Sequence, residues 1–190
     1  TCVSYGCVPK KLWHTIAHFG HSSQLAIDVG WKLDPPTLNW NVAQTKMRQY
    51  IKQLNNRHES KCNEQNVRIV RGAASFINES TISINNEQYS AKNILIAVGG
   101  TALNLDVPGF DFCDTSYEFF NWESQPKRVA LIGGGYIAVE LASILNALGT
   151  KVDIIIRKEH VLRGFDQDVR TFLQDKYQAR GITIHNNVTP

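Results

Sequence analysis

The stretch Leu131-Ile132-Gly133-Gly134-Gly135-Tyr136-Ile137-Ala138 decides the fold of this chain. The apolar run from Arg128 to Ile132 predicts a strand, and apolar residues at helical spacing predict a helix from Tyr136 to Leu148. Gly149 ends that helix, and Lys151 to Ile156 predicts a second strand. Strand, glycine turn, helix and strand in this order are typical of the βαβ unit of a Rossmann-like α/β domain.

The glycine turn is suited to the pyrophosphate of a dinucleotide. Gly133 permits a tight turn, Gly135 lets the backbone approach the phosphates, and Ala138 still allows the helix to pack closely on the strand. The N-terminus of the helix favours negative charge. A glycine turn is a weak signal alone, but here it joins a strand to a helix, as a nucleotide site requires. We therefore predict a nucleotide-binding domain over residues 127–190, with a boundary near Pro126.

The end of the second strand indicates which dinucleotide is bound. An NAD site has an acidic residue there, about 20 residues after the glycines, to bond the ribose 2′-hydroxyl. This chain has Arg157 instead, and Arg157, Lys158 and Arg163 could surround a 2′-phosphate. The sequence therefore predicts NADPH, with a solvated basic strand end as the alternative.

Two cysteines, Cys2 and Cys7, precede a helix that the apolar spacing predicts from just after Cys7 to about Ile27. The CxxxxC spacing differs from the CxxC pairs of zinc sites, so we predict no metal. A thiol at a helix N-terminus is stabilised as thiolate, and Lys10 and Lys11 add positive charge one turn later. The pair is therefore a candidate redox site, and a purely structural disulfide is the alternative.

The middle of the chain reads as a helix followed by short strands. After the breaker Asp34-Pro35-Pro36-Thr37, a helical pattern runs from Asn39 to about Arg57. Asn85-Asn86 reads as a turn within a small antiparallel meander. Three runs are typical of its strands: Val67 to Val70, Thr81 to Ile84 and Asn93 to Val98.

Composition excludes several classes of protein. The 190 residues are 43% hydrophobic and 19% charged with a net charge of +3, which is typical of a globular protein and too little charge for a nucleic-acid partner. The apolar runs are far shorter than the roughly 20 residues that cross a bilayer, so we expect no membrane span. The unpaired Cys62 and Cys113 favour a reducing compartment, and we predict a cytoplasmic protein. Because the chain starts at Thr1, we expect it to be part of a longer protein.

Several motifs occur in one order in a known family. Thr1 to Lys11 and Gly133 to Ala142 strongly resemble the flavoprotein disulfide reductases, class I of the pyridine nucleotide-disulfide oxidoreductases, and within them the glutathione reductases. Ile94 to Gly100 resembles the family's segment that returns towards FAD, and Arg157 to Asp166 resembles its loop for the 2′-phosphate of NADPH. The resemblance implies two Rossmann-like domains, both incomplete. Residues 1–126 would be the latter part of the FAD domain, and residues 127–190 part of the NADPH domain. The FAD glycine motif and the dimerisation domain would lie outside the chain.

The resemblance also implies roles for individual residues. Cys2 would attack the substrate disulfide, and Cys7 would be the thiolate beside the flavin. Lys10 would lie beside the flavin and pair with Glu140, while Tyr136 would cover the nicotinamide pocket. The implied FAD contacts are Thr1, Cys2, Lys10, Ala74, Gly99 and Ser116. The implied NADPH contacts are Gly133, Gly134, Gly135, Tyr136, Ile137, Glu140, Arg157, Lys158 and Arg163.

The implied substrate is glutathione disulfide, and the implied assembly is a homodimer. The family's acid/base histidine belongs to the dimerisation domain, so we assign that role to none of this chain's histidines and expect them at the solvated surface: His14, His18, His21, His58, His160 and His185. Three local departures from the family's usual residues bear on the choice of disulfide: Ser4-Tyr5, His58 and Val98. The alternatives are a relative of mercuric reductase or dihydrolipoamide dehydrogenase, or a nucleotide-binding redox sensor without turnover.

Overall fold

The computed structural model describes residues 1–34, 37–103 and 105–189, so part of the predicted breaker, residues 35–36, lies outside the described residues. The chain forms two compact units. The first unit combines Thr1–Ile51 with Asn104–Pro190, and the second comprises Lys52–Leu103. Each unit is described by itself below.

The first unit begins with two consecutive helices, α1 (Cys2–Tyr5) and α2 (Cys7–Asp28), separated by Gly6. The sequence predicts α2 correctly but gives no sign of the short α1. Along α2, Pro9, Trp13 and Ala17 are buried, and their spacing of four residues places them on one helix face. That face packs towards the core of the unit.

Helix α3 (Trp40–Glu64) confirms the second predicted helix and extends beyond Arg57. Its first turns fix the unit's aromatic core. The Trp40 ring stacks on Trp13 with 4.1 Å between centroids, and the Trp40 Nε1–H donates to the Trp122 carbonyl at 3.0 Å. The buried Gln44 amide donates to the Phe120 carbonyl at 2.6 Å. These bonds join α3 to the segment that contains η1 (Phe110–Phe112) and α4 (Ser116–Phe119).

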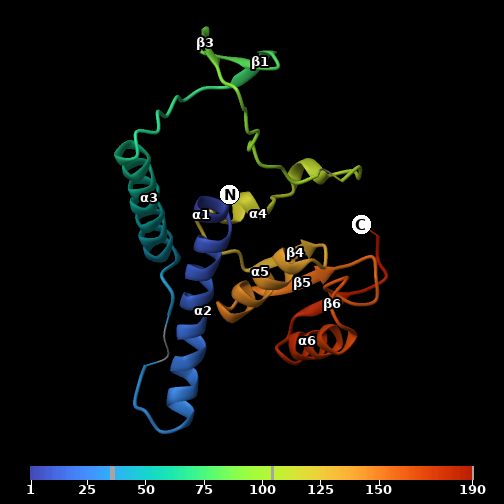
Figure 1. Cartoon of the computed structure of the whole chain (residues 1–190). Helices are drawn as coiled ribbons and strands as arrows, with labels where there is room; N and C mark the ends of the chain where they lie inside the picture. The colour runs from blue at the N-terminus through green and yellow to red at the C-terminus, as the bar shows by residue number, and fades with distance from the viewer. Residues whose placement is uncertain (35–36, 104, 190) are drawn as a thin grey trace. The chain divides into compact units, whose positions relative to one another are not determined.

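The remainder of the first unit is a three-stranded parallel sheet with its connecting helices (Figure 1). The sheet order is β4-β5-β6, and the predicted strand, helix and strand are all confirmed. The Tyr177 hydroxyl donates to the Val139 carbonyl at 2.7 Å and so links the two helices that connect the strands. The elements in chain order are β4 (Arg128–Ile132), α5 (Tyr136–Ala147), β5 (Lys151–Ile155), α6 (Gln167–Ala179) and β6 (Thr183–His185).

One buried carboxylate ties the three strands together. Asp153 on β5 accepts a hydrogen bond from Arg128 Nε of β4 at 3.1 Å, and its other oxygen lies 2.9 Å from His185 Nε2 of β6. The bond to His185, followed by the Arg128 guanidinium, lowers the pKa of Asp153 against the opposing effect of burial. His185 therefore departs from the expectation of a merely solvated histidine, because the neighbouring strand supplies it with a partner.

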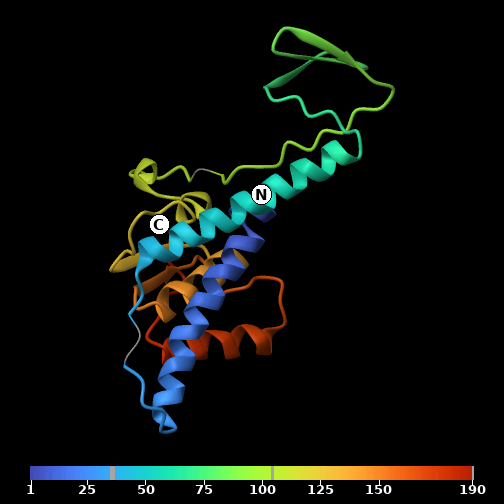
Figure 2. The ribbon, with the colours of Figure 1, turned by 90° about the vertical axis from the view of Figure 1, so that its left-hand side faces the viewer.

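The second unit contains the predicted antiparallel meander, formed by β1 (Ala74–Asn78), β2 (Thr81–Ile84) and β3 (Glu87–Ser90) in that order (Figure 2). The predicted turn at Asn85-Asn86 is confirmed, since both residues have positive φ, 52° and 66°, and Ile84 pairs with Glu87.

Two predicted strands of this unit are wrong. The runs from Val67 to Val70 and from Asn93 to Val98 form no strand among the described residues. Both have the β-branched and aliphatic residues of a strand, but neither pairs with a described neighbour, and a strand requires one. The strands that form instead, β1 and β3, expose most of their residues and lack the apolar alternation that would have predicted them.

No helix in the described part of the chain is both long enough and apolar enough to cross a membrane.

Candidate functional site

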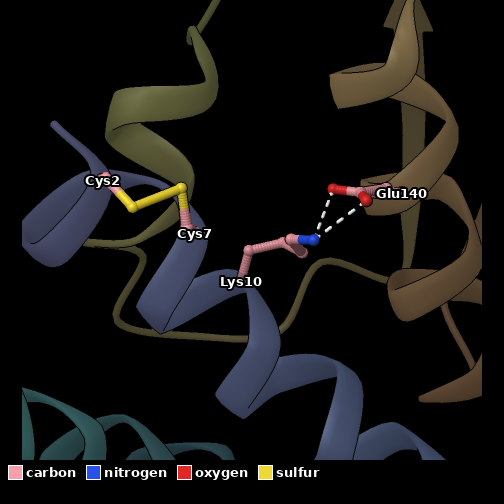
Figure 3. Close-up of a disulfide and its surroundings, with 4 residues drawn as sticks. All are labelled: Cys2, Cys7, Lys10 and Glu140. Carbon is pink, nitrogen blue, oxygen red and sulfur yellow. Dashed lines mark hydrogen bonds and ion pairs between the residues drawn. A yellow bond between two sulfur atoms is a disulfide. The ribbon is translucent and has the colours of Figure 1, made fainter.

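A disulfide joins Cys2 to Cys7 at the point where α1 gives way to α2 (Figure 3). Gly6 makes this junction possible, because a Cβ at that position would lie 3.3 Å from both the Cys2 Cα and the Thr1 carbonyl oxygen. The Tyr5 N–H donates to that same oxygen at 2.8 Å, and the Lys10 N–H donates to the Gly6 carbonyl at 2.9 Å. The backbone therefore brings the two cysteines within 4.7 Å, measured between their Cα atoms.

The surroundings of the disulfide favour thiolate chemistry. Both cysteines are exposed, so a small disulfide could reach them from solvent. Cys7 is the first residue of a 22-residue helix whose first turn contains no acidic residue. The N–H groups and the dipole of that helix end stabilise a negative charge on Cys7.

Lys10 lies one turn further along α2 and reaches across to α5 (Figure 3). Its Nζ lies 2.9 Å from Glu140 Oε1 and 2.9 Å from Glu140 Oε2. The side chains are 29% and 41% exposed, so this ion pair is partly desolvated. The structure thus brings together Cys2, Cys7, Lys10 and Glu140. The roles expected of these residues towards a flavin stay predictions.

The three glycines of the turn after β4 have different surroundings. Gly133 has φ of +119° and donates its N–H to the Ile155 carbonyl, which anchors the turn to β5. At Gly134 a Cβ would lie 2.8 Å from the Ile156 side chain and 3.3 Å from the Val161 Cα, so only glycine fits without movement. At Gly135, the N-cap of α5, a Cβ would meet nothing within 4 Å, and no side chain caps the helix.

Open space at Gly135 together with an uncapped helix N-terminus fits the pyrophosphate of a dinucleotide, because the first N–H groups of α5 have no intrahelical partner. The side chains of Tyr136 and Ile137, which begin α5, are 64% and 45% exposed. Tyr136 lies one turn before Glu140 on α5, so the glycine turn and the residue that pairs with Lys10 lie at the same end of one helix.

The basic residues predicted for the 2′-phosphate follow β5. The side chains of Arg157, Lys158 and Arg163 are exposed, and within the described ranges none makes a hydrogen bond or ion pair. Three guanidinium or ammonium groups without carboxylate partners are available to an anionic ligand. This arrangement fits a phosphate better than it fits a ribose hydroxyl.

Sequence reasoning missed the residue that organises this basic loop. Arg170 on α6 donates through Nε to the Val161 carbonyl at 2.8 Å and through a terminal nitrogen to the His160 carbonyl at 3.3 Å. The Leu162 N–H donates to the Gly134 carbonyl at 2.6 Å. Because these partners are backbone carbonyls, no pattern of side chains around Arg170 signals the contact.

The residues expected to contact FAD belong to both units. Thr1 and Ser116 lie in the first, and Ser116 opens α4. Next to Ser116, the Tyr117 ring stacks on Tyr5 of α1 with 3.9 Å between centroids. Ala74, the first residue of β1, and Gly99 belong to the second unit, and their expected contacts with FAD stay predictions.

No group of three or more metal-binding side chains occurs in the ranges that the structure describes. The surface of the first unit has two hollows. One is lined by residues 37–41 and 123–125, and the other lies along the start of α3. No candidate site residue lines either hollow.

Comparison with known proteins gives concordant matches. A sequence profile of the family described as "Pyridine nucleotide-disulphide oxidoreductase" matches residues 1–190. The chain is 37% identical over 184 residues to a glutathione reductase of Nostoc sp., covering 97% of this chain and 40% of that protein. It is 38% identical over 195 residues to a glutathione reductase of Schizosaccharomyces pombe, covering 98% and 42%. A chloroplastic/mitochondrial glutathione reductase of Pisum sativum is 34% identical over 191 residues, covering 100% and 35%.

Among solved structures, the HOCl-induced flavoprotein disulfide reductase RclA from Escherichia coli superposes with a TM-score of 0.84 at 23% identity, over 100% of this chain and 41% of that one. A Cu(II) complex of the same reductase gives 0.81 at 22% identity, over 99% and 40%. These likenesses confirm the predicted α/β fold. The chain spans about two fifths of the length of the relatives that it matches.

Proposed function

Because the chain belongs to the pyridine nucleotide-disulphide oxidoreductases, we propose that the protein is an NADPH-dependent flavoprotein disulfide reductase that reduces glutathione disulfide. The observation that carries the proposal is the exposed Cys2–Cys7 disulfide at a helix N-terminus, with the Lys10–Glu140 ion pair one turn away. The three glutathione reductases that match almost the whole chain support glutathione disulfide as the substrate.

The cysteines of this chain account for the reduction of the substrate. With both thiols reduced, the Cys2 thiolate attacks one sulfur of glutathione disulfide, forms a mixed disulfide with one glutathione and releases the other as a thiolate. The Cys7 thiolate then attacks the Cys2 sulfur, restores the Cys2–Cys7 bond and releases the second glutathione. Two electrons leave the protein in each cycle. Cys7 is the better placed of the two to persist as thiolate, because the α2 N-terminus stabilises its charge.

FAD and NADPH, when bound, would supply the electron pair that reopens the Cys2–Cys7 disulfide. The open space at Gly135 and the free N–H groups of α5 would receive the pyrophosphate. Arg157, Lys158 and Arg163 would neutralise the 2′-phosphate. Glu140 holds the Lys10 ammonium in position, so that a fixed positive charge lies near the disulfide.

The wider organisation of the protein belongs to the same proposal. Residues 1–126 would be the latter part of an FAD domain and residues 127–190 part of an NADPH domain. The assembly would be a homodimer, in which the acid/base histidine would come from another domain. The free cysteines, Cys62 and Cys113, support a reducing compartment and hence the cytoplasm.

The test is anaerobic mixing of the full-length, FAD-loaded protein with NADPH, followed by glutathione disulfide. We expect flavin reduction and then repeated release of glutathione. Cys2→Ser should abolish that release while still allowing flavin reduction, and Cys113→Ser, which removes an exposed free thiol, should have no effect on either step. Reduction by NADPH without turnover of any disulfide would contradict the proposal and favour a redox sensor.

A further inference from the structure

Two stacked tyrosines, one of them on the same short helix as Cys2, have no part in the proposed reaction. Tyr5 is the last residue of α1, between the two cysteines in sequence, and Tyr117 is the second residue of α4. Their rings stack with 3.9 Å between centroids and 26° between planes. We infer that Tyr5 and Tyr117, here called the tyrosine pair, hold α1 in place when the disulfide opens and so keep Cys2 within reach of Cys7.

Tyr117 projects from a rigid support. Thr115 caps α4, with its hydroxyl accepting from the Tyr117 N–H at 3.2 Å and its own N–H donating to Glu118 Oε2 at 2.7 Å. Hydrogen bonds from the Thr115 hydroxyl and N–H lower the pKa of Glu118, so this cap stays charged and intact at neutral pH. At the other end of α4, Phe119 is buried in the aromatic core. The ring that stacks on Tyr5 is therefore fixed on both sides.

α1, by contrast, is weakly held by its own structure. It is four residues long and buries none of them. A single helical turn is unstable in isolation because its nucleation is unfavourable. The disulfide provides a covalent tie to α2, and that tie is lost whenever the pair is reduced. The tyrosine pair involves no sulfur, so its contact to α4 survives reduction.

The position of α1 matters most in the dithiol state. There Cys2 must meet the substrate and then, as a mixed disulfide, must be attacked by Cys7. A stack that confines α1 raises the effective concentration of one sulfur at the other and so favours ring closure. In the oxidised state the bond itself already confines α1. Loss of the stack should therefore stabilise the dithiol relative to the disulfide, which makes Tyr117 a positioning residue for the cysteines.

We expect the hydroxyls of the tyrosine pair to contribute little to holding α1 in place. A hydrogen bond with the Tyr5 side chain raises the pKa of Tyr117, so the Tyr117 ring stays neutral at neutral pH. Ring stacking, rather than charge, is the contact that we expect to matter, and phenylalanine at position 117 should preserve it.

The test compares Tyr117→Ala, Tyr117→Phe and wild type in the full-length protein. Each is equilibrated anaerobically in dithiothreitol buffers of graded oxidation, alkylated, and read by peptide mass spectrometry, which separates Cys2 and Cys7 from Cys62 and Cys113. Tyr117→Ala should shift the ratio of dithiol to disulfide by roughly 2- to 10-fold towards dithiol, the range that a pair of aromatic rings contributes. Tyr117→Phe should stay near wild type. The matched control is Phe172→Ala, which removes an exposed ring from α6 of the same unit.

This inference rests on the proposed function for its benefit to catalysis, but its test needs neither NADPH nor glutathione. If the protein turned over no disulfide, the equilibrium would still shift on removal of the ring. An unchanged equilibrium in Tyr117→Ala would overturn the inference, as would an equal shift in Phe172→Ala. A Tyr117→Phe variant that behaved like Tyr117→Ala would overturn the assignment to ring stacking.

Discussion

The Lys10 ammonium lies 2.9 Å from each carboxylate oxygen of Glu140, although 130 positions separate the two residues. The contact joins the helix that carries Cys7 to the helix that follows the glycine turn. The two ends of the proposed electron path, the disulfide and the glycine turn, therefore lie on helices that one ion pair connects.

Glu140→Gln should slow flavin reduction by NADPH and leave the later exchange between the cysteines and glutathione disulfide unchanged. The reason is that Lys10 would lose the charge that orients it. Lys10→Ala should slow the same step, and the double variant should be no slower than the worse single variant. Because the pair is partly exposed, its loss should cost at most about 1 kcal/mol of unfolding free energy. Stopped-flow absorbance checks the rates, and Glu59→Gln, which breaks the exposed pair with Arg71, is the control. Additive effects would show that the two residues act separately.

Substitutions at two adjacent glycines should separate folding from nucleotide binding. Gly134→Ala should lower the unfolding free energy by about 1–3 kcal/mol, because the new methyl meets the Ile156 side chain at 2.8 Å. Gly135→Ala should leave stability nearly unchanged, since its methyl would project into open space, yet it should raise the KM for NADPH severalfold by obstructing the phosphates. Urea unfolding and steady-state kinetics measure the two effects. Normal NADPH kinetics in Gly135→Ala would place the pyrophosphate elsewhere.

Arg157→Glu combined with Arg163→Ala should raise the KM for NADPH far more than the KM for NADH. Each charge-assisted hydrogen bond to the 2′-phosphate contributes about 1–3 kcal/mol, and NADH has no such phosphate to lose. Arg57→Glu, at an exposed position of α3, is the control for the charge reversal at Arg157. An equal loss with both cofactors would contradict the NADPH assignment.

Asp153 should make the stability of the first unit dependent on pH at the acidic end. The pKa of Asp153 is lowered in the folded protein, first by the bond to His185 and then by Arg128. In the unfolded chain an aspartate has a pKa of about 3.9. The stabilisation is therefore fully present above about pH 4 and is lost as the pH falls through the folded pKa. Asp153→Asn should reduce the unfolding free energy at pH 7 by about 1–3 kcal/mol and flatten the acid limb.

Urea unfolding of Asp153→Asn at pH 7 and at acidic pH checks this dependence. Asp175→Asn, at an exposed position of α6, is the control. A variant as stable as wild type at pH 7, with the same acid limb, would show that the bonds to Arg128 and His185 add nothing to stability.

In the first unit the sequence predicts α2, β4, α5 and β5, but it gives no prediction for α1, α4, α6 or β6. In the second unit it predicts one of the three strands correctly and the turn that follows it. The glycine turn lies between a strong strand pattern and a strong helix pattern, so local signals and tertiary structure agree there. In the second unit, the run from Asn93 to Val98 has the composition of a buried strand, yet no described segment pairs with it. Polar strands such as Glu87–Ser90 form because Thr81–Ile84 offers them hydrogen bonds, which no propensity records.

The sequence likewise predicts some parts of the candidate site and not others. The CxxxxC motif and the basic residues after β5 are visible in the sequence, because each is a local pattern. The partnership of Lys10 with Glu140 could be expected only through the family resemblance. The tyrosine pair and the bonds of Arg170 to backbone carbonyls arise from packing between distant segments, and nothing in the order of residues encodes them separately.

The bonds around Gly134 have an evolutionary consequence. The Gly134 carbonyl and the Arg170 side chain hold the backbone of residues 160–162 through hydrogen bonds. The side chains of Arg157, Lys158 and Arg163 are exposed and have no hydrogen-bond or ion-pair partner among the residues that the structure describes. The path of the loop and the charge that it displays are thus set by different residues. If these side chains bind the coenzyme as proposed, selection could exchange them one at a time and change the coenzyme preference without disturbing the folding of the loop.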